Sequence, residues 1–359
     1  MLCKYIIRGD ENMINLENRI IDEEAPVFII AELSGNHQGS IDKAKEIIRA
    51  AKDAGVDAVK LQTYTPDTIT LDCDNEYFQI TQGTLWDGRT LYNLYEEAYT
   101  PWEWHKELME YASSLGLICF SSPFDTTAVD FLEELGVPAY KIASFEINDI
   151  QLIKYIAAKG KPILLSTGVA THEEIKEALR VCKDLGNENV ILLKCASAYP
   201  TPFEDINLRT MVHMKVEFKV ITGLSDHTLG YEVALGAVAL GAKVIEKHLT
   251  INREDGSVDS AFSMEPHEFK QMVKAIRNLE KALGKVTYEL TDKQKASTAH
   301  KRSLFIAKDI KKGEVFSPET IKSVRPGNGL NTRHYDEIIG KRAKADYKKG
   351  TPLSWDMIK

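Results

Sequence analysis

Two histidines stand at the ends of two neighbouring apolar segments. His227 ends a run that begins at Gly223, and His248 ends a run that begins at Gly241. The small-residue segment Tyr231–Leu240 between them predicts a helix, so the three form a strand–helix–strand unit with parallel strands. Parallel neighbours bring their carboxyl ends to one rim of a barrel, where two neutral imidazoles suit a divalent metal. The alternative is two unrelated histidines whose hydrogen bonds are satisfied in the core.

Two lysines, Lys60 and Lys141, interrupt apolar strand-like runs, where a charge is rarely buried unless it is paired. One interpretation is a structural ion pair with Glu32 or Glu146. The other is an anion site, because lysine is a point-charge partner for phosphate and carboxylate. Serine hydroxyls at other strand ends add donors around the same rim: Ser122, Ser144, Ser166 and Ser225. The residues thus predict a metal beside an anionic, phosphorylated substrate, with a Schiff-base lysine and no metal as the alternative.

The elements that would position these residues repeat along the chain. Eight apolar runs that stop on polar residues predict strands at Val27–Glu32, Val56–Thr63, Leu117–Ser122, Ala139–Ser144, Pro162–Thr167, Val190–Cys195, Val220–Ser225 and Lys243–His248. Apolar spacing of 3.6 residues predicts helices at Ile41–Ala54, Pro101–Leu115, Thr126–Leu135, Ile150–Ala158, His172–Leu185, Asn207–Phe218, Tyr231–Leu240 and Pro266–Leu283. Eight such units over about 250 residues predict an α/β fold, the (β/α)8 TIM barrel. An open doubly wound sheet is the alternative, although no Gly-x-Gly-x-x-Gly turn follows the first strand.

Two segments lie outside this repeat. Tyr64–Thr100 is long for a barrel loop, and we expect it to form a lid or a wall of the substrate pocket; the alternative is a surface hairpin without a role. A charged linker, residues 291–302, then separates the predicted barrel, residues 1–290, from a small domain, residues 303–359. We expect strands at Ser303–Lys308 and Ile321–Val324 in that domain, which is small enough to gain by leaning on a larger surface.

Composition excludes several classes of protein. The formal net charge of −8 argues against a partner held by charge, such as nucleic acid or an anionic membrane surface. No apolar run approaches the length of a membrane span. The five scattered cysteines, without Cys-x-x-Cys spacing, indicate a reducing compartment. Met1–Asn18 lacks the apolar core of a secretory signal, so we expect a cytoplasmic protein.

Ordered motifs along nearly the whole chain beyond residue 25 resemble the sialic acid synthase family, whose members condense phosphoenolpyruvate with an N-acetylated sugar. The matching stretches are Ile30–His37, Ala58–Thr63, Ser121–Phe124, Ala139–Ser144, Leu165–Gly168, Gly223–Thr228 and Val244–His248. The tail, with Arg302-Ser303-Leu304 and Arg325-Pro326-Gly327, is similar to the family's antifreeze-like (SAF) domain. The resemblance therefore implies a barrel followed by a C-terminal SAF domain.

Within the family the chain is most similar to the pseudaminic acid synthase branch. Leu33-Ser34 follows Glu32 where the N-acetylneuraminate branch usually has Ile-Gly, and Ser197 stands where that branch commonly has asparagine. Gly88–Tyr92 and Thr100–His105 also match the pseudaminic pattern. The implied acceptor is 2,4-diacetamido-2,4,6-trideoxy-β-L-altropyranose. An N-acetylneuraminate or legionaminic acid synthase is the alternative.

The resemblance also implies roles for individual residues. His227 and His248 would hold Mn²⁺, or Mg²⁺ or Co²⁺, and the catalytic carboxylates would be Glu32, Glu146 and Glu246. The implied substrate-binding residues are Lys60, Gln62, Ser122, Lys141, Ser144, Ser166, Ser197, Tyr199, Ser225, Asp259 and Arg325. A domain-swapped homodimer would bring Arg325 to the barrel of the other subunit. A metal-independent lyase or aldolase and a non-catalytic sugar-binding protein remain as other hypotheses.

Overall fold

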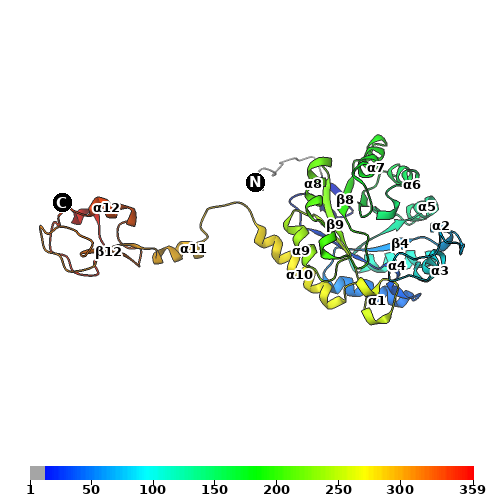
Figure 1. Ribbon diagram of the computed structural model, residues 1–359, viewed down its shortest axis with the longest axis horizontal. Helices are drawn as coiled ribbons and strands as arrows, with labels where there is room; N and C mark the ends of the chain where they lie inside the picture. Colours follow the sequence, from blue (N-terminus) through cyan, green and yellow to red (C-terminus); the bar gives the residue numbers. More distant parts are fainter. Residues whose placement is uncertain (1–12) are drawn as a thin grey trace. The chain divides into compact units, whose positions relative to one another are not determined.

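Short apolar strands pair in parallel and close into a barrel in the computed structural model, which describes residues 13–359 (Figure 1). The last strand pairs with the first, Val244–His248 lying beside Phe28–Glu32. The strands are β3 Phe28–Glu32, β4 Ala58–Thr63, β5 Ile118–Pro123, β6 Tyr140–Ile142, β7 Ile163–Ser166, β8 Val190–Lys194, β9 Ile221–Asp226 and β10 Val244–His248. The predicted (β/α)8 barrel is confirmed, and the open doubly wound sheet is excluded because a closed barrel has no edge strand.

Amphipathic helices cover the outside of the barrel (Figure 1). α1 shows why they form: its stripe of Ala44, Ile47, Ile48 and Ala51 is buried, and the side chain of Ser40 caps its first turn. The helices that follow the barrel strands are α1 Ile41–Ala54, α4 Trp102–Ser114, α5 Thr126–Glu134, α6 Ile150–Ala157, α7 His172–Asp184, α8 Arg209–Phe218, α9 Glu232–Ala239 and α10 Pro266–Leu283.

A β-hairpin that precedes the barrel contributes to the barrel's interior. Its strands are β1 Ile14–Leu16 and β2 Arg19–Ile21, which pair antiparallel. Ile14, Leu16 and Ile21 belong to the same buried cluster as the inward-facing barrel residues, such as Phe28 and Phe120. The sequence analysis expected no element here, because the segment is short and half polar. Residues 1–12, including Cys3, lie outside the described residues.

The long segment between β4 and α4 is ordered by its own hydrogen bonds. It contains α2 Pro66–Ile69 and α3 Leu91–Ala98. The Ile80 amide donates to Arg89 O (2.9 Å), and the Gly88 amide donates to Ile80 O (3.0 Å), so the intervening residues form a tight loop. The Tyr64 and Tyr95 rings pack edge to face at 5.6 Å. This segment is therefore a structured excursion from the repeat.

The chain divides into two compact units, Met1–Gly284 and Lys285–Lys359. The predicted linker, residues 291–302, contains α11 Asp292–Ser297. In the second unit β11 Ser303–Ile306 pairs antiparallel with β12 Ile321–Val324, and α12 spans Tyr335–Ile338. Its core includes the buried residues Leu304, Ile306, Phe316, Ile338 and Leu353. Single-turn 3-10 helices lie at η2 Ser34–His37, η3 Ser144–Glu146, η4 Phe203–Asp205, η5 Arg253–Asp255, η6 Ser260–Phe262, η7 Thr298–His300, η8 Thr332–His334 and η9 Trp355–Met357.

Residues 13–359 contain no helix that combines the length and the apolar character needed to cross a bilayer.

The hairpin should contribute measurably to the stability of the barrel. We expect Leu16→Ala, which removes a fully buried side chain, to lower the free energy of unfolding by about 2–5 kcal/mol. Ile20→Ala is the matched control, because Ile20 lies on the same hairpin but is 48% exposed, and its effect should be within about 1 kcal/mol. Urea denaturation of both variants measures the difference. Equal effects of the two substitutions would mean that the buried side chains of the hairpin do not stabilise the barrel interior.

Candidate active site

Four charged side chains meet at the centre of the barrel, near the carboxyl ends of its strands. Lys60 Nζ lies 2.5 Å from Glu32 Oε2 and 4.0 Å from Glu246 Oε2, and Lys141 Nζ lies 3.9 Å from Glu246 Oε1. Gln62 Nε2 donates to Glu32 Oε1 (2.9 Å). None of the four charged side chains is more than 5% exposed. The lysine–glutamate pairing that the sequence analysis kept open is present, but Lys141 pairs with Glu246 and not with Glu146.

Serine hydroxyls surround this cluster. Lys60 Nζ donates to Ser122 Oγ (3.1 Å), and Ser225 Oγ donates to Glu246 Oε1 (2.8 Å). Ser166, at the end of β7, is buried, and its hydroxyl has no hydrogen-bond partner among residues 13–359. A buried hydroxyl without a partner carries an unfavourable desolvation energy, so a free donor at this place favours a ligand-binding role.

Burial and neighbouring charges set the protonation of this cluster. Burial raises the pKa of Glu32, although Lys60 opposes the shift. Burial also acts to raise the pKa of Glu246, but Lys60 and Lys141 outweigh it and hold that pKa below its ordinary value. Burial lowers the pKa of Lys141. Of the two carboxylates in this cluster, Glu32 is therefore the one that takes up a proton more readily.

The two histidines of the sequence analysis lie side by side. The ring centroids of His227 and His248 are 5.3 Å apart, and both side chains are buried. His227 Nδ1 is 3.1 Å from Ala196 O, and because a carbonyl only accepts, Nδ1 carries the hydrogen and Nε2 keeps a lone pair. His248 Nδ1 is buried and has no hydrogen-bond partner in the described part of the chain. Two imidazoles with free lone pairs fit a divalent metal.

The charge states of these histidines bear on that fit. Burial and the neighbouring His227 lower the pKa of His248 far below its ordinary value, so His248 is neutral. Burial acts to lower the pKa of His227, but the negative charge of the Cys195 thiolate, whose Sγ is 3.7 Å from Nδ1, outweighs burial and raises that pKa. A metal and a proton would therefore compete for His227 Nε2. Within residues 13–359 no group of three or more His, Cys, Asp or Glu side chains is placed to hold a metal. The protein would supply two ligands, with water and substrate completing the shell.

A second polar group lies at the ends of β6 and β8. The hydroxyls of Ser144 and Ser197 are 2.6 Å apart. Gly168 comes so close to them that a Cβ on it would lie 2.1 Å from Ser197 Oγ and 3.1 Å from Cys195 Sγ. Only glycine fits this approach without a shift of its neighbours. The Leu165–Gly168 motif therefore ends in a residue that the close packing of the rim requires.

Glu146, in η3 after β6, has a buried carboxylate oxygen for which the described residues supply no hydrogen-bond partner. Burial raises the pKa of Glu146 to about 7, although Lys141 opposes the shift. Its carboxyl group is thus poised to exchange a proton near neutral pH.

Aromatic rings cover the histidines on one side. The Tyr199 ring lies 4.5 Å from the His227 ring and 5.7 Å from the Trp86 ring, measured between centroids. Phe262 packs against both Tyr199 (5.1 Å) and His248 (5.0 Å). Trp86 belongs to the Tyr64–Thr100 segment, so this segment reaches the rim as a wall. The sequence analysis missed Phe262, because it lies in the single-turn helix η6, which is too short to show a periodic pattern.

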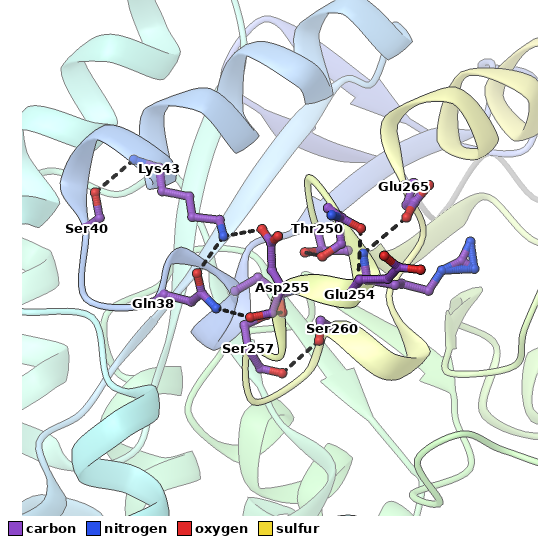
Figure 2. A network of polar contacts seen from close by, with 12 residues as sticks. Gln38, Ser40, Lys43, Thr250, Glu254, Asp255, Ser257, Ser260 and Glu265 are labelled. Atoms are coloured by element: carbon purple, nitrogen blue, oxygen red, sulfur yellow. Dashed lines mark hydrogen bonds and ion pairs between the residues drawn. The ribbon is translucent and has the colours of Figure 1, made fainter.

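The loop that follows β10 is held over the rim by contacts with the segment after β3. Figure 2 shows Lys43 and Gln38 converging on Asp255. Lys43 forms an ion pair with the Asp255 carboxylate and donates to Gln38 Oε1 (2.6 Å), while Gln38 Nε2 donates to Asp255 O (2.5 Å). Deeper in the loop, Ser257 Oγ donates to Asn36 Oδ1 (2.8 Å). These bonds position the loop that carries Asp259.

Asp259 stands next to the same segment. The backbone amide of Gly35 donates to its carboxylate, but burial and Glu32 dominate and raise the pKa of Asp259 to about 7. Asp259 therefore joins Glu146 as a carboxyl group that changes charge near neutral pH.

The remaining predicted residue, Arg325, is exposed in the C-terminal unit. Its role in the site stays a prediction.

Comparison with known proteins gives two matching family models. The NeuB family matches residues 47–288, and the SAF domain matches residues 301–359. A pseudaminic acid synthase of Campylobacter jejuni subsp. jejuni is 50% identical over 327 residues, covering 91% of this chain and 95% of the relative. One of Helicobacter pylori is 48% identical over 334 residues, covering 93% of this chain and 98% of the relative.

Solved structures show the same fold. An N-acetylneuraminic acid synthetase of Leptospira borgpetersenii, in complex with citrate, aligns with a TM-score of 0.71 and 32% identity, over 80% of this chain and 96% of the other. The spore coat polysaccharide biosynthesis protein of Bacillus subtilis aligns with a TM-score of 0.66 and 32% identity, over 97% of this chain and 99% of the other. With a family model over more than half of its length and relatives at about 50% identity, the chain belongs to the NeuB family.

Proposed function

We propose that the protein is a pseudaminic acid synthase, which condenses phosphoenolpyruvate with 2,4-diacetamido-2,4,6-trideoxy-β-L-altropyranose and releases phosphate. The observation that carries the proposal is the 48–50% identity to two proteins of that name over more than nine-tenths of this chain. The rim supports it independently, since two buried lysines, the serine hydroxyls around them and a histidine pair suit a phosphorylated carboxylate beside a carbonyl group.

Phosphoenolpyruvate would bind at the lysine cluster. Lys60 and Lys141 offer two cations in a site without bulk water, where their attraction for phosphate and carboxylate is strong. In the structure the same cations are paired with Glu32 and Glu246. The serines that complete this subsite are Ser122, Ser144, Ser166 and Ser225.

The acceptor sugar would lie on the aromatic side, against Tyr199, with Gln62, Ser197 and Asp259 as polar partners. His227 and His248 would hold a divalent metal, Mn²⁺ or else Mg²⁺ or Co²⁺. When bound, this ion would supply Lewis-acid polarisation of the acceptor aldehyde.

The proposed reaction forms one carbon–carbon bond and breaks one carbon–oxygen bond. Carbon 3 of phosphoenolpyruvate bonds to the aldehyde carbon, whose oxygen takes up a proton and becomes a hydroxyl. Water adds to carbon 2, and the bond between carbon 2 and the phosphate oxygen then breaks, leaving a ketone and inorganic phosphate. Glu32, beside Lys60, is placed to direct the water and accept its proton, while Glu146 is suited to orient the acceptor and exchange a proton with it.

We also propose that a second copy of the chain completes the site. The loops after β6, β7, β8 and β9 expose apolar side chains, Phe145 (58%), Val169 (51%), Phe203 (55%) and Leu229 (49%), and such a surface favours a protein partner. Residues 301–359 carry 14 Lys and Arg against 7 Asp and Glu, a net charge of +7, whereas residues 1–300 carry 31 against 46, a net charge of −15. These opposite charges favour binding of the C-terminal domain of one subunit to the barrel rim of the other. That domain would supply Arg325 to the site.

A substrate panel tests the proposed function. We expect phosphate release from phosphoenolpyruvate only when the diacetamido-trideoxy-altrose is present, with much slower release for N-acetylmannosamine or the legionaminic acid precursor. A chelator should abolish turnover, and added Mn²⁺ should restore it. Binding of sugar without phosphate release would favour the non-catalytic hypothesis. A substrate adduct trapped by borohydride would favour a Schiff-base lysine.

Lys141→Met should weaken phosphoenolpyruvate binding, because it removes one of the two buried cations. We expect KM for phosphoenolpyruvate to rise about 10- to 100-fold, the loss typical of one charge-assisted hydrogen bond, with little change in KM for the acceptor. Lys159→Met is the control, since Lys159 pairs with Asp130 at the outer helices. Thermal melts check that both variants fold. An unchanged KM in folded Lys141→Met would remove Lys141 from this subsite.

The shared site predicts complementation between two inactive variants. Arg325→Ala lacks the arginine and Lys60→Met lacks a working barrel, so each homodimer should be impaired. In a mixed dimer one intact barrel receives an intact Arg325, and part of the activity should return. Mass spectrometry confirms the exchange of subunits. If exchange is complete and activity does not return, Arg325 does not act across subunits.

A further inference from the structure

A fully buried ion pair joins two barrel strands one residue before each histidine. Asp226 on β9 and Lys247 on β10 stand directly opposite each other in the parallel register. Their Oδ2 and Nζ atoms are 2.8 Å apart, and their side chains are 0% and 1% exposed. His227 and His248 are the next residues on the two strands. The pair is thus the last cross-strand contact before the histidines.

The ion pair lies on the outer face of the strands, away from substrate. Side chains alternate along a strand, so the residues on either side of Asp226 and Lys247 face the barrel interior, and these two face the helix layer. Their neighbours on that face, Leu224, Ile245 and Leu249, are fully buried members of the apolar core. Two charges therefore interrupt a row of hydrophobic residues.

The same network fixes the backbone on the far side of His227. Asp226 Oδ1 accepts hydrogen bonds from the amide (2.9 Å) and the hydroxyl (2.8 Å) of Thr228. Lys247 Nζ also donates to Thr228 O (2.6 Å). The residues before and after His227 are therefore both tied to the strand that carries His248.

Stability alone does not explain such a pair. The desolvation of two buried charges often exceeds their attraction, and apolar residues of similar size are frequently as stable or more so. A metal held by two imidazoles, by contrast, requires their nitrogen atoms to converge on ligand distances of about 2.0–2.1 Å. Residues that orient metal ligands typically influence metal affinity 10- to 100-fold.

We propose that the Asp226–Lys247 ion pair is a positioning element that holds His227 and His248 at the separation a divalent metal requires. The inference rests on the proposed function in assuming that these histidines bind the metal. It assigns a role to two residues that touch neither substrate nor metal.

The test is a charge-neutral double variant, Asp226→Asn with Lys247→Met, which leaves no uncompensated buried charge. Mn²⁺ binding to the full-length protein without substrates is measured by electron paramagnetic resonance, and Co²⁺ geometry by visible absorption. We expect Kd for Mn²⁺ to rise about 10- to 100-fold and the Co²⁺ bands to shift, with the barrel folded by circular dichroism. Thr222→Val is the matched control, since Thr222 is buried on the same face of β9 and its hydroxyl has no partner. Its metal binding should match that of the unmodified chain.

Thr228→Val supplies a second readout if the double variant does not fold. It removes only the hydroxyl bond to Asp226, so Kd for Mn²⁺ should rise by a smaller factor, roughly threefold or more. An unchanged Kd and an unchanged Co²⁺ spectrum in a folded double variant, or an unchanged Kd in Thr228→Val if the double variant does not fold, overturns the positioning role.

His227→Ala and His248→Ala separate this proposal from the one on which it rests. If they abolish metal binding while the ion-pair variants leave it unchanged, only the positioning role is wrong. If they also leave metal binding unchanged, the two-histidine site itself is wrong.

Discussion

Four charges removed from water at the centre of a barrel are the constraint on which the rest of the structure depends. Lys60, Lys141, Glu32 and Glu246 are each tolerated there only because each has an oppositely charged partner at 2.5–4.0 Å. Closing the barrel sets this proximity, since the strand that carries Glu246 pairs with the strand that carries Glu32. An open sheet with the same strands would leave its first and last strands at opposite edges. The closed topology is therefore a requirement of the site's electrostatics as well as of the fold.

Exclusion of water from this cluster requires cover at both ends of the barrel. At one end the hairpin β1–β2 contributes Leu16 and Ile21 to the interior cluster. At the other, Trp86 donates to Val258 O (3.0 Å), which joins the long segment after β4 to the loop after β10. That loop is in turn held by Asp255, through its contacts with the segment after β3 (Figure 2). The loops above the charges thus restrain one another, and a low-dielectric site results in which each fixed donor acts strongly on an anion.

The fold was largely predictable from the sequence, because apolar runs that stop on polar residues recur at the spacing of a (β/α)8 barrel. The ends of the strands were less predictable. A strand was expected at Ala139–Ser144, but it stops at Ile142 because Ser144 begins a 3-10 turn. The hairpin was missed, since three-residue strands carry almost no periodic signal. The partners of individual side chains could not be predicted from the sequence either. That Lys141 faces Glu246 follows from the register of strands far apart in the chain, which no local pattern encodes.

The carboxyl groups of Glu246 and Glu146 lie in contrasting environments, which suit them to different roles. Glu246 lies between two lysines and accepts a hydrogen bond from Ser225, which keeps it ionised despite its burial. Among residues 13–359, Glu146 has a single cation nearby, Lys141, which lies beyond ion-pair distance, and one of its oxygens is unpartnered. Burial therefore dominates, and the pKa of Glu146 rises to about 7. Environments that move two carboxyl pKa values apart separate the group that stabilises charge from the group that moves protons. We therefore infer that Glu246 holds the lysines in place for the anion, and that Glu146 exchanges the proton with the acceptor.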